Sequence, residues 1–176
     1  GELEFNLENY DKAIAEYRKL YRDYRSHQAA STAWFWVGEA RLKLKDTTAA
    51  ISAFERQTKE FPKAAESPQA LLRAAELRTE RNELSAATSS LTDLIRDFPN
   101  STAGGDAEIV LGNVYLRQNQ HSRSRKVFEQ VLARQKRADL RIRANLGLGR
   151  IAADQRRFSE ARGFYKLATE NASDEY

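Results

Sequence analysis

The sequence predicts an all-α fold, a right-handed α-α superhelix of about five helical hairpins of which the first is truncated. Three observations lead to this prediction: small and large apolar residues that recur with one period, helix-capping and helix-ending residues at the expected junctions, and a composition poor in turn formers. Only 3 prolines and 8 glycines occur in 176 residues, fewer than an all-β fold with many tight turns needs. With 41% apolar and 31% charged residues, the composition suits a helical protein surrounded by water.

Three columns of residues, each with a spacing of 37 positions, define the repeat. The first column is small: Ala13, Ala50, Ala87, Ser124 and Ala161. Four residues later comes a large apolar or aromatic residue: Tyr17, Phe54, Leu91, Phe128 and Tyr165. Twelve residues before the first column lies another small residue: Gly1, Gly38, Ala75, Gly112 and Gly149. Two antiparallel helices approach closely only where small side chains face each other, so the columns predict one helix pair per copy.

This register divides the chain into five copies of one array, roughly 1–28, 29–65, 66–102, 103–137 and 138–176. The expected helix pairs are 31–44 with 47–61, 68–81 with 84–98, about 105–118 with 121–134, and about 138–154 with 158–169; residues 1–7 end a first helix. Asp46 is placed to cap the second helix of its copy, and Pro62 and Pro99 are placed to end helices. One hairpin cannot bury its apolar face alone, so neighbouring hairpins are expected to stack.

The repeat resembles the tetratricopeptide pattern W-x₂-L-G-x₂-Y, A-x₃-F and P. The second copy carries Trp34, Val37, Gly38, Ala50, Phe54 and Pro62, and the fourth carries Leu111, Gly112, Tyr115, Ser124 and Phe128. Arg41 and Arg78 depart from the pattern, since the family has an aromatic residue there. The resemblance covers nearly the whole chain. The 37-residue period is longer than the usual period of about 34 and is similar to that of bacterial envelope members, such as the TolA-associated cell-division coordinator and the lipoprotein of the outer-membrane β-barrel assembly machine.

The resemblance implies a non-catalytic protein–protein interaction scaffold within a bacterial multiprotein assembly, in the periplasm or envelope first and the cytoplasm second. A peptide or protein partner would bind in a concave groove lined by the first helix of each hairpin. On that analogy, the groove residues are Phe35, Glu39, Leu42, Lys43, Leu72, Glu76, Thr79, Ile109, Asn113, Arg117, Leu146, Arg150 and Asp154. Their charge grades from acidic at Glu39 and Glu76 to basic at Arg150, which could orient the partner.

Three consecutive aromatic residues, Trp34, Phe35 and Trp36, cannot all face one core, because successive helical residues point about 100° apart. Trp34 belongs to the core pattern of the repeat. For Phe35 and Trp36 two interpretations stay open. One of them could be an exposed anchor for a partner, or they could pack against the neighbouring hairpins.

The net charge of +4 lies in the second half of the chain. Between Arg117 and Arg157, 12 basic residues face only Glu129, Asp139 and Asp154. An alternative function is therefore a module that binds polyanions, nucleic acid or anionic lipid, through the region Arg123–Arg143. Arginine stems also cover apolar surface at helix junctions, so nucleic acid is not the partner we expect.

No catalytic, cofactor or metal site is predicted. The chain has no cysteine, its two histidines, His27 and His121, lie at hairpin junctions without partners by spacing, and no catalytic or phosphate-loop motif occurs. No apolar run approaches the roughly 18 residues of a membrane span. The chain opens at Gly1 without a methionine, and we expect it to be a piece of a longer protein. Exposed repeat ends make self-association a further expectation.

Overall fold

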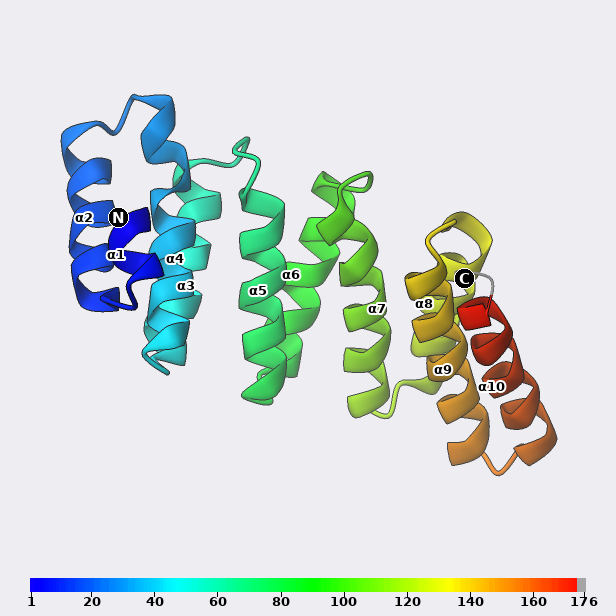
Figure 1. The fold of residues 1–176 in the computed structure, drawn as a ribbon. Coiled ribbons are helices and arrows are strands. Elements are labelled where there is room, and N and C mark those ends of the chain that lie inside the picture. The colour runs from blue at the N-terminus through cyan, green and yellow to red at the C-terminus, as the bar shows by residue number, and fades with distance from the viewer. Residues whose placement is uncertain (174–176) are drawn as a thin grey trace. The chain divides into compact units, whose positions relative to one another are not determined.

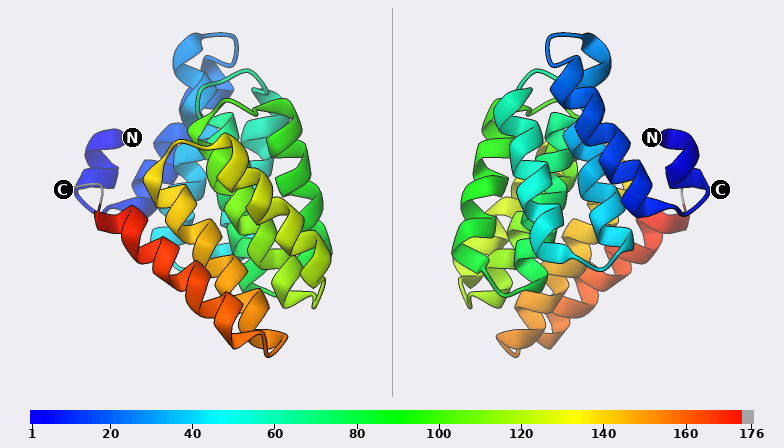
Figure 2. Two further views of the ribbon diagram at one scale, coloured as in Figure 1. Left: turned by 90° about the vertical axis from the view of Figure 1, so that its right-hand side faces the viewer. Right: turned by 90° about the vertical axis from the view of Figure 1, so that its left-hand side faces the viewer.

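A computed structural model of the chain describes residues 1–173. Figures 1 and 2 show helices joined by short loops, and the described part of the chain contains no strand. The elements in chain order are α1 (Glu2–Asn6), α2 (Tyr10–Asp23), the 3₁₀ helix η1 (Gln28–Thr32), α3 (Ala33–Lys43), α4 (Thr47–Glu60), α5 (Ser67–Glu80), α6 (Leu84–Asp97), α7 (Thr102–Arg117), α8 (His121–Arg134), α9 (Ala138–Asp154) and α10 (Phe158–Ser173). The predicted all-α class is confirmed.

The chain forms two compact units, Gly1–Glu83 and Leu84–Tyr176. Unit 1 holds α1 to α5, and in it consecutive helices from α1 to α5 pack against each other. Unit 2 holds α6 to α10, where consecutive helices from α6 onward pack in the same way and α7 also contacts α9. The division falls between the two helices of the third predicted hairpin.

Most of the predicted helix boundaries hold to within a residue or two. The exceptions are the start of α7 and the end of α10, which was predicted at residue 169 and lies at Ser173. The Asp46 carboxylate accepts a hydrogen bond of 3.0 Å from the Ala49 N–H, as predicted. Helix α7 begins three residues before the predicted Gly105, because the Ser101 hydroxyl accepts a hydrogen bond of 2.9 Å from the Gly104 N–H and caps the helix earlier. The helix predicted from residue 31 is preceded by η1, and α3 itself begins at Ala33.

The glycine and aromatic columns meet inside the hairpins. A Cβ atom added to Gly38 would lie 2.5 Å from the Phe54 ring, and one added to Gly112 would lie 2.4 Å from the Phe128 ring. Both rings are fully buried. The glycine is thus required because the ring 16 residues later lies directly on its backbone. In the third copy, where Ala75 replaces the glycine, the later residue is the non-aromatic Leu91.

The turn inside every hairpin has the same backbone conformation. Five residues have a positive φ, between 58° and 63°: Glu8, Lys45, Asn82, Asn119 and Arg156. They are spaced by 37 residues, and each lies between the first and second helix of its hairpin. Asn82 and Asn119 are of a type enriched in this conformation, but the other three positions gave no such signal, because Glu, Lys and Arg rarely adopt left-handed backbone. The hairpin turn therefore has one geometry regardless of the side chain that it carries.

Polar side chains support the helices where the repeat pattern is broken. Arg78, which replaces the family's aromatic residue, forms an ion pair with Glu55, and the Arg41 guanidinium lies 3.4 Å from the Asp46 carboxylate. Gln57 is fully buried. Its amide oxygen accepts a hydrogen bond of 3.1 Å from the Phe35 N–H, and its amide nitrogen donates to the Ser31 carbonyl, so Gln57 fastens the start of α3.

Replacing Gly38 tests the contact between glycine and ring. Gly38→Ala should lower the free energy of unfolding by about 1–3 kcal/mol, because the new Cβ displaces the buried Phe54 ring. The measurement is urea denaturation followed by far-UV circular dichroism. Gly163, on α10, has no atom within 4 Å of an added Cβ, so Gly163→Ala should stabilise the helix by up to about 1 kcal/mol. A Gly38→Ala variant as stable as the parent chain would contradict this packing.

Candidate partner-binding faces

In unit 1, the predicted groove residues Glu39 and Glu76 are brought together by Arg73. The Arg73 guanidinium from α5 lies 3.5 Å from the Glu39 carboxylate on α3 and 3.5 Å from the Glu76 carboxylate on its own helix. Lys43 is exposed near the end of α3, and Thr79 donates to the Ala75 carbonyl. The sequence pattern did not single out Arg73, whose only signal is its spacing of three residues from Glu76. These side chains form a polar surface across α3 and α5.

The apolar residues predicted for the groove of unit 1 lie mostly in the core. Leu72 is 3% exposed. Phe35 and Leu42 are partly buried against the core cluster of α4 and α5, and the Phe35 ring centroid lies 5.8 Å from that of Phe54. The cause is the stacking of hairpins, since the residue after Trp34 faces the following hairpin.

In unit 2, five of the six predicted groove residues are exposed on α7 and α9: Asn113, Arg117, Leu146, Arg150 and Asp154. The sixth, Ile109, is 1% exposed and belongs to the core around Phe128. Leu146 occupies the same repeat position as Ile109 but is 46% exposed. Unit 2 therefore presents a surface with one large apolar side chain among charged and amide groups.

We define the first-helix face as Glu39, Lys43, Arg73 and Glu76 in unit 1 and Asn113, Arg117, Leu146, Arg150 and Asp154 in unit 2. The chemistry of this face is charge complementarity and hydrogen bonding. Carboxylates can accept from backbone or basic groups of a bound segment, and guanidinium groups can donate to its carbonyl or carboxylate oxygens. Neither set of residues holds a reacting group with an activating partner.

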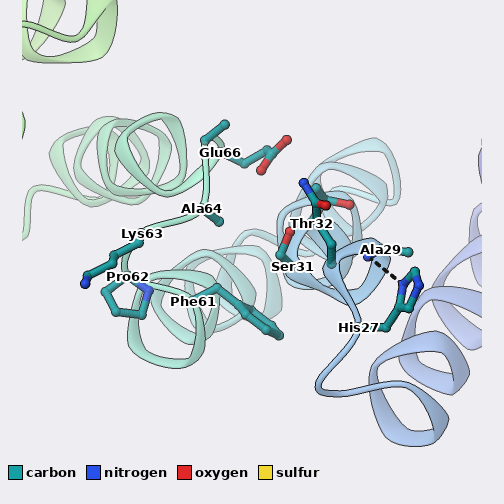
Figure 3. A pocket seen from close by; sticks show the side chains of 11 residues that line it. His27, Ala29, Ser31, Thr32, Phe61, Pro62, Lys63, Ala64 and Glu66 are labelled. Atoms are coloured by element: carbon teal, nitrogen blue, oxygen red, sulfur yellow. Dashed lines mark hydrogen bonds between the residues drawn. The ribbon is translucent and has the colours of Figure 1, made fainter.

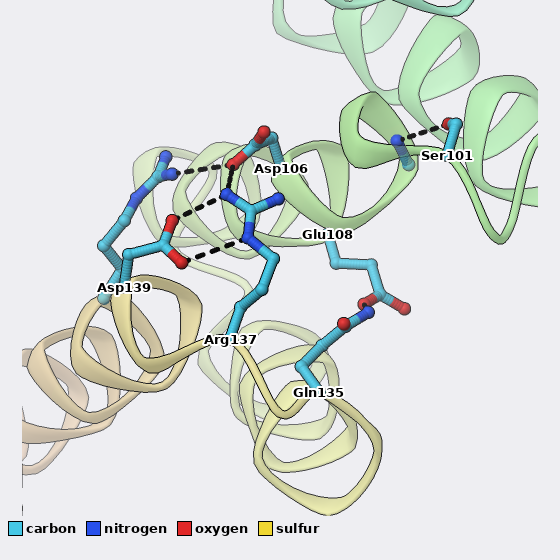
Figure 4. A network of polar contacts seen from close by, with 8 residues as sticks. Ser101, Asp106, Glu108, Gln135, Arg137 and Asp139 are labelled. Carbon is cyan, nitrogen blue, oxygen red and sulfur yellow. Dashed lines mark hydrogen bonds and ion pairs between the residues drawn. The ribbon is translucent and has the colours of Figure 1, made fainter. Parts of the chain in front are cut away.

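The arginines of the region Arg123–Arg143 are engaged inside unit 2, and Figure 4 shows Arg137 beside Asp106 and Asp139. Arg137 and Arg143 lie 3.3 and 3.1 Å from the Asp106 carboxylate, and Arg137 also pairs with Asp139 at 2.7 Å. Arg134 pairs with the buried Glu108. The remaining arginines are held as well: Arg141 donates to the Leu132 carbonyl, Arg125 pairs with Glu160, and Arg123 donates to Gln120. The contacts with Asp106 and Glu108 fasten α7 to the α8–α9 junction. Lys126 and Lys136 are exposed.

The aromatic residues at positions 34 to 36 each pack against a different part of unit 1. Trp34 is 6% exposed, in the core of α2 and α3. Trp36 contacts the preceding hairpin, with ring centroids 5.6 Å from Phe5 and 6.4 Å from Tyr17. Phe35 contacts the following hairpin, as described above. Of the two interpretations, the structure shows packing for both residues, and neither is an exposed anchor.

A cavity that the sequence did not predict lies between two linkers of unit 1 (Figure 3). Its volume is about 720 Å³, and its walls come from residues 27–32 and 61–66. The His27 imidazole accepts a hydrogen bond of 3.1 Å from the Ala29 N–H, so this ring caps η1. Phe61, Pro62 and Ala64 supply the apolar part of the wall.

Over residues 1–173, no group of His, Asp and Glu side chains is arranged to hold a metal ion. In the same part of the chain, no helix combines the length and the apolar character of a membrane span.

Family profiles of the description "Tetratricopeptide repeat" match residues 1–65 and 109–176, and a second profile of that description matches residues 69–101. The chain belongs to the tetratricopeptide repeat family. These matches agree with the columns of small and aromatic residues and with the hairpins that the structure contains. Among curated proteins, no sequence matches significantly.

Several solved structures resemble the chain over nearly its whole length. The structure of MamA has a TM-score of 0.79 at 20% identity, covering 99% of this chain and 95% of MamA. BtubC from P. vanneervenii has a TM-score of 0.80 at 15% identity, covering 99% and 77%. The Rap conjugation gene regulator of plasmid pLS20, solved with the Phr* peptide, has a TM-score of 0.65 at 18% identity, covering 99% and 52%. At these identities the likeness shows the fold, and it confirms the predicted class of tetratricopeptide-like hairpins.

The Asp139 carboxylate provides a test of the α7–α9 junction. A hydrogen bond from Arg137 lowers the pKa of Asp139 below its ordinary 3.8, against the opposing effect of desolvation. The stabilisation is therefore present above pH 3.8 and is lost as the pH falls through the lowered pKa. Asp139→Asn should cost a few tenths to about 1 kcal/mol at pH 7, because the pair is half exposed, and less at about pH 2, where more of the Asp139 carboxylate is protonated.

Urea denaturation of both chains at the two pH values measures this difference. Asp154→Asn, at the exposed end of the same helix, is the matched control and should change stability by less than about 0.5 kcal/mol. If the difference between Asp139→Asn and the parent chain persisted unchanged in acid, the ion pair would not be its source.

Proposed function

We propose that this tetratricopeptide protein is a non-catalytic protein–protein interaction scaffold that binds a peptide segment of a partner on its first-helix face. One observation carries the proposal. Most of the recurring small and large apolar residues are buried in the hairpin cores, with Tyr165 as an exception. Polar and charged side chains at recurring positions of α3, α5, α7 and α9 reach the surface. In a stacked array, the surface that no hairpin covers is where a partner can bind.

The two units offer different chemistry to such a segment. The unit 1 part of the face alternates acid, base and acid through Glu39, Arg73 and Glu76. The unit 2 part combines Asn113 and Arg150 with the apolar Leu146. Leu72 and Ile109 are buried, and the proposal leaves them out of the contact surface. A segment with a basic stretch suits unit 1, and a segment that combines an acidic or amide-containing stretch with one apolar residue suits unit 2.

Two further features support an interaction scaffold. The Rap regulator, which shares the fold, was solved with a bound peptide. Two side chains with catalytic potential have structural roles, since His27 caps η1 and Glu108 pairs with Arg134. The place of the scaffold in a bacterial envelope assembly, in the periplasm or at the envelope, remains part of the proposal and rests on the 37-residue period.

Binding of a polyanion through Arg123–Arg143 has weaker support from the geometry. A protein that neutralises phosphates needs cations that are free to displace counterions. Arg134, Arg137 and Arg143 already contact carboxylates of the same unit.

Charge reversal on the first-helix face tests the proposal. Peptides selected from a random display library against the parent chain should bind at least about tenfold more weakly to the double variant Glu76→Lys, Arg150→Glu, because one or more charge-assisted contacts become repulsive. Fluorescence anisotropy of a labelled selected peptide measures the affinity. The two single variants tell which unit holds the peptide.

The matched control reverses one acid and one base on second helices, Asp11→Lys with Arg162→Glu, which are both exposed. This control leaves the net charge unchanged, as the test variant does, and should retain the affinity. Equal affinities for the test variant and the parent chain would remove the first-helix face as the binding surface.

A further inference from the structure

Three arginines of unit 1 surround two aromatic rings on the side of the second helices α2 and α4. The rings of Tyr21 and Trp34 meet edge to face, with centroids 5.2 Å apart. The Arg56 guanidinium lies 4.0 Å from the Trp34 centroid and 5.2 Å from that of Tyr21. Arg18 lies 5.9 Å from the Trp34 centroid, and Arg25 lies 5.5 Å from that of Tyr21. The five side chains form one contiguous group.

The aromatic rings of this group are buried, and its guanidinium groups lie on the protein surface. Trp34 and Tyr21 are 6% and 9% exposed, whereas the side chains of Arg25 and Arg56 are 66% and 46% exposed. The rings support the guanidinium groups from below and leave them open to water. Within residues 1–173, no carboxylate pairs with Arg18.

One carboxylate of the chain already occupies part of this group. Glu60 pairs with Arg25, lies 3.9 Å from Arg56 and accepts a hydrogen bond from the Tyr21 hydroxyl. That hydrogen bond, followed by the effect of the two arginines, lowers the pKa of Glu60. A carboxylate therefore binds here in its charged form. Three guanidinium groups against one carboxylate leave two positive charges uncompensated.

Stacking prepares a guanidinium group to bind carboxylates. An arginine that lies over an aromatic ring keeps its five N–H donors in the plane of the group, directed outward at its edge. The stacked side chain has already lost part of its conformational freedom, so less entropy is lost when a carboxylate binds. A lysine has the same charge but lacks the planar fork.

We propose that Arg18, Arg25 and Arg56, supported by Trp34 and Tyr21, form a second docking surface that takes an acidic peptide segment of a partner protein, rich in Asp and Glu. We call these five residues the arginine–aromatic surface. It lies on α2, α4, the start of α3 and the loop after α2, and it shares no residue with the first-helix face.

An acidic peptide fits this surface better than a nucleic acid does. Glu60 lies among the arginines. Asp23, which is nearby in sequence, pairs with Arg22 at 2.8 Å. Both carboxylates would repel a continuous phosphate backbone. An extended peptide can place separate carboxylates beside Arg18 and Arg56 and avoid these acids. The shallow geometry, two rings beneath three exposed guanidinium groups, also suits side-chain carboxylates that approach singly.

The experiment uses a labelled peptide of alternating glutamate and glycine, with the glutamine–glycine peptide as the neutral probe. Fluorescence anisotropy at about 0.1 M salt should detect binding of the acidic peptide only, since surface charge attraction still acts at that ionic strength. The double variant Arg18→Gln, Arg56→Gln should bind it about three- to tenfold more weakly. Lys126→Gln with Arg162→Gln removes the same charge from exposed positions of unit 2 and should leave the affinity unchanged.

Two further variants separate binding from a purely structural role of the arginines. Glu60→Gln removes the internal competitor, so it should tighten binding of the acidic peptide at least about twofold, a gain that a packing role does not produce. Arg56→Lys retains the charge but should still weaken binding, because the ammonium group cannot form the planar fork. Thermal unfolding of each variant shows whether it is folded.

The outcomes are distinct. Loss of affinity in the arginine variants together with a gain in Glu60→Gln supports the docking surface. The proposal is overturned if Glu60→Gln binds no more tightly than the parent chain, or if the unit 2 control loses as much affinity as the double variant. Single-stranded DNA that binds as tightly as the acidic peptide, with the same losses, would also overturn it in favour of a general polyanion site.

Discussion

The contact between a glycine backbone and an aromatic ring is the interaction on which the hairpins depend, except the third, where Ala75 and Leu91 take the place of this pair. Phe54 lies on Gly38 and Phe128 lies on Gly112, each ring reaching back 16 residues from the second helix to the first. Phe128 also lies against Gly147 of the next hairpin, where an added Cβ would be 2.3 Å from the ring. One ring thus sets the separation of two helices within a hairpin and of one hairpin from the next. The surfaces offered to partners are whatever this packing leaves uncovered.

That constraint explains why the two candidate surfaces differ in character. The first-helix face consists of side chains that the packing does not use, so its polar groups pair loosely at 3.5 Å around Arg73. The arginines of the arginine–aromatic surface are supported more rigidly, because the Trp34 and Tyr21 rings on which they stack belong to the hydrophobic core. The core itself orients the arginines above it. A partner would meet adaptable charges on one side of unit 1 and pre-positioned guanidinium groups on the side of the second helices.

The repeat and its helices could be predicted from the sequence because they depend on residue size and spacing alone. Residue size and spacing predicted the contact of Gly38 with Phe54 and the helix cap at Asp46. The arrangement of the surface could not be predicted as well, because burial at a given repeat position depends on the neighbouring hairpin. Ile109 and Leu146 share one repeat position, yet the first is buried and the second exposed. The cluster around Trp34 combines residues from α2, α3 and α4, and it has no period that a sequence pattern could reveal.

The hairpin turns have a consequence for how such an array can change in length. Glu8, Lys45, Asn82, Asn119 and Arg156 adopt the same left-handed conformation at equal intervals, although only the two asparagines share a residue type. Since backbone geometry at this point tolerates such different residues, a duplicated segment of one full period would reproduce both the bend and the pairing of ring with glycine. An insertion of only a few residues within a helix would rotate the ring away from its glycine. Growth and shortening of the array are therefore expected in whole periods, with smaller insertions confined to the linkers between hairpins.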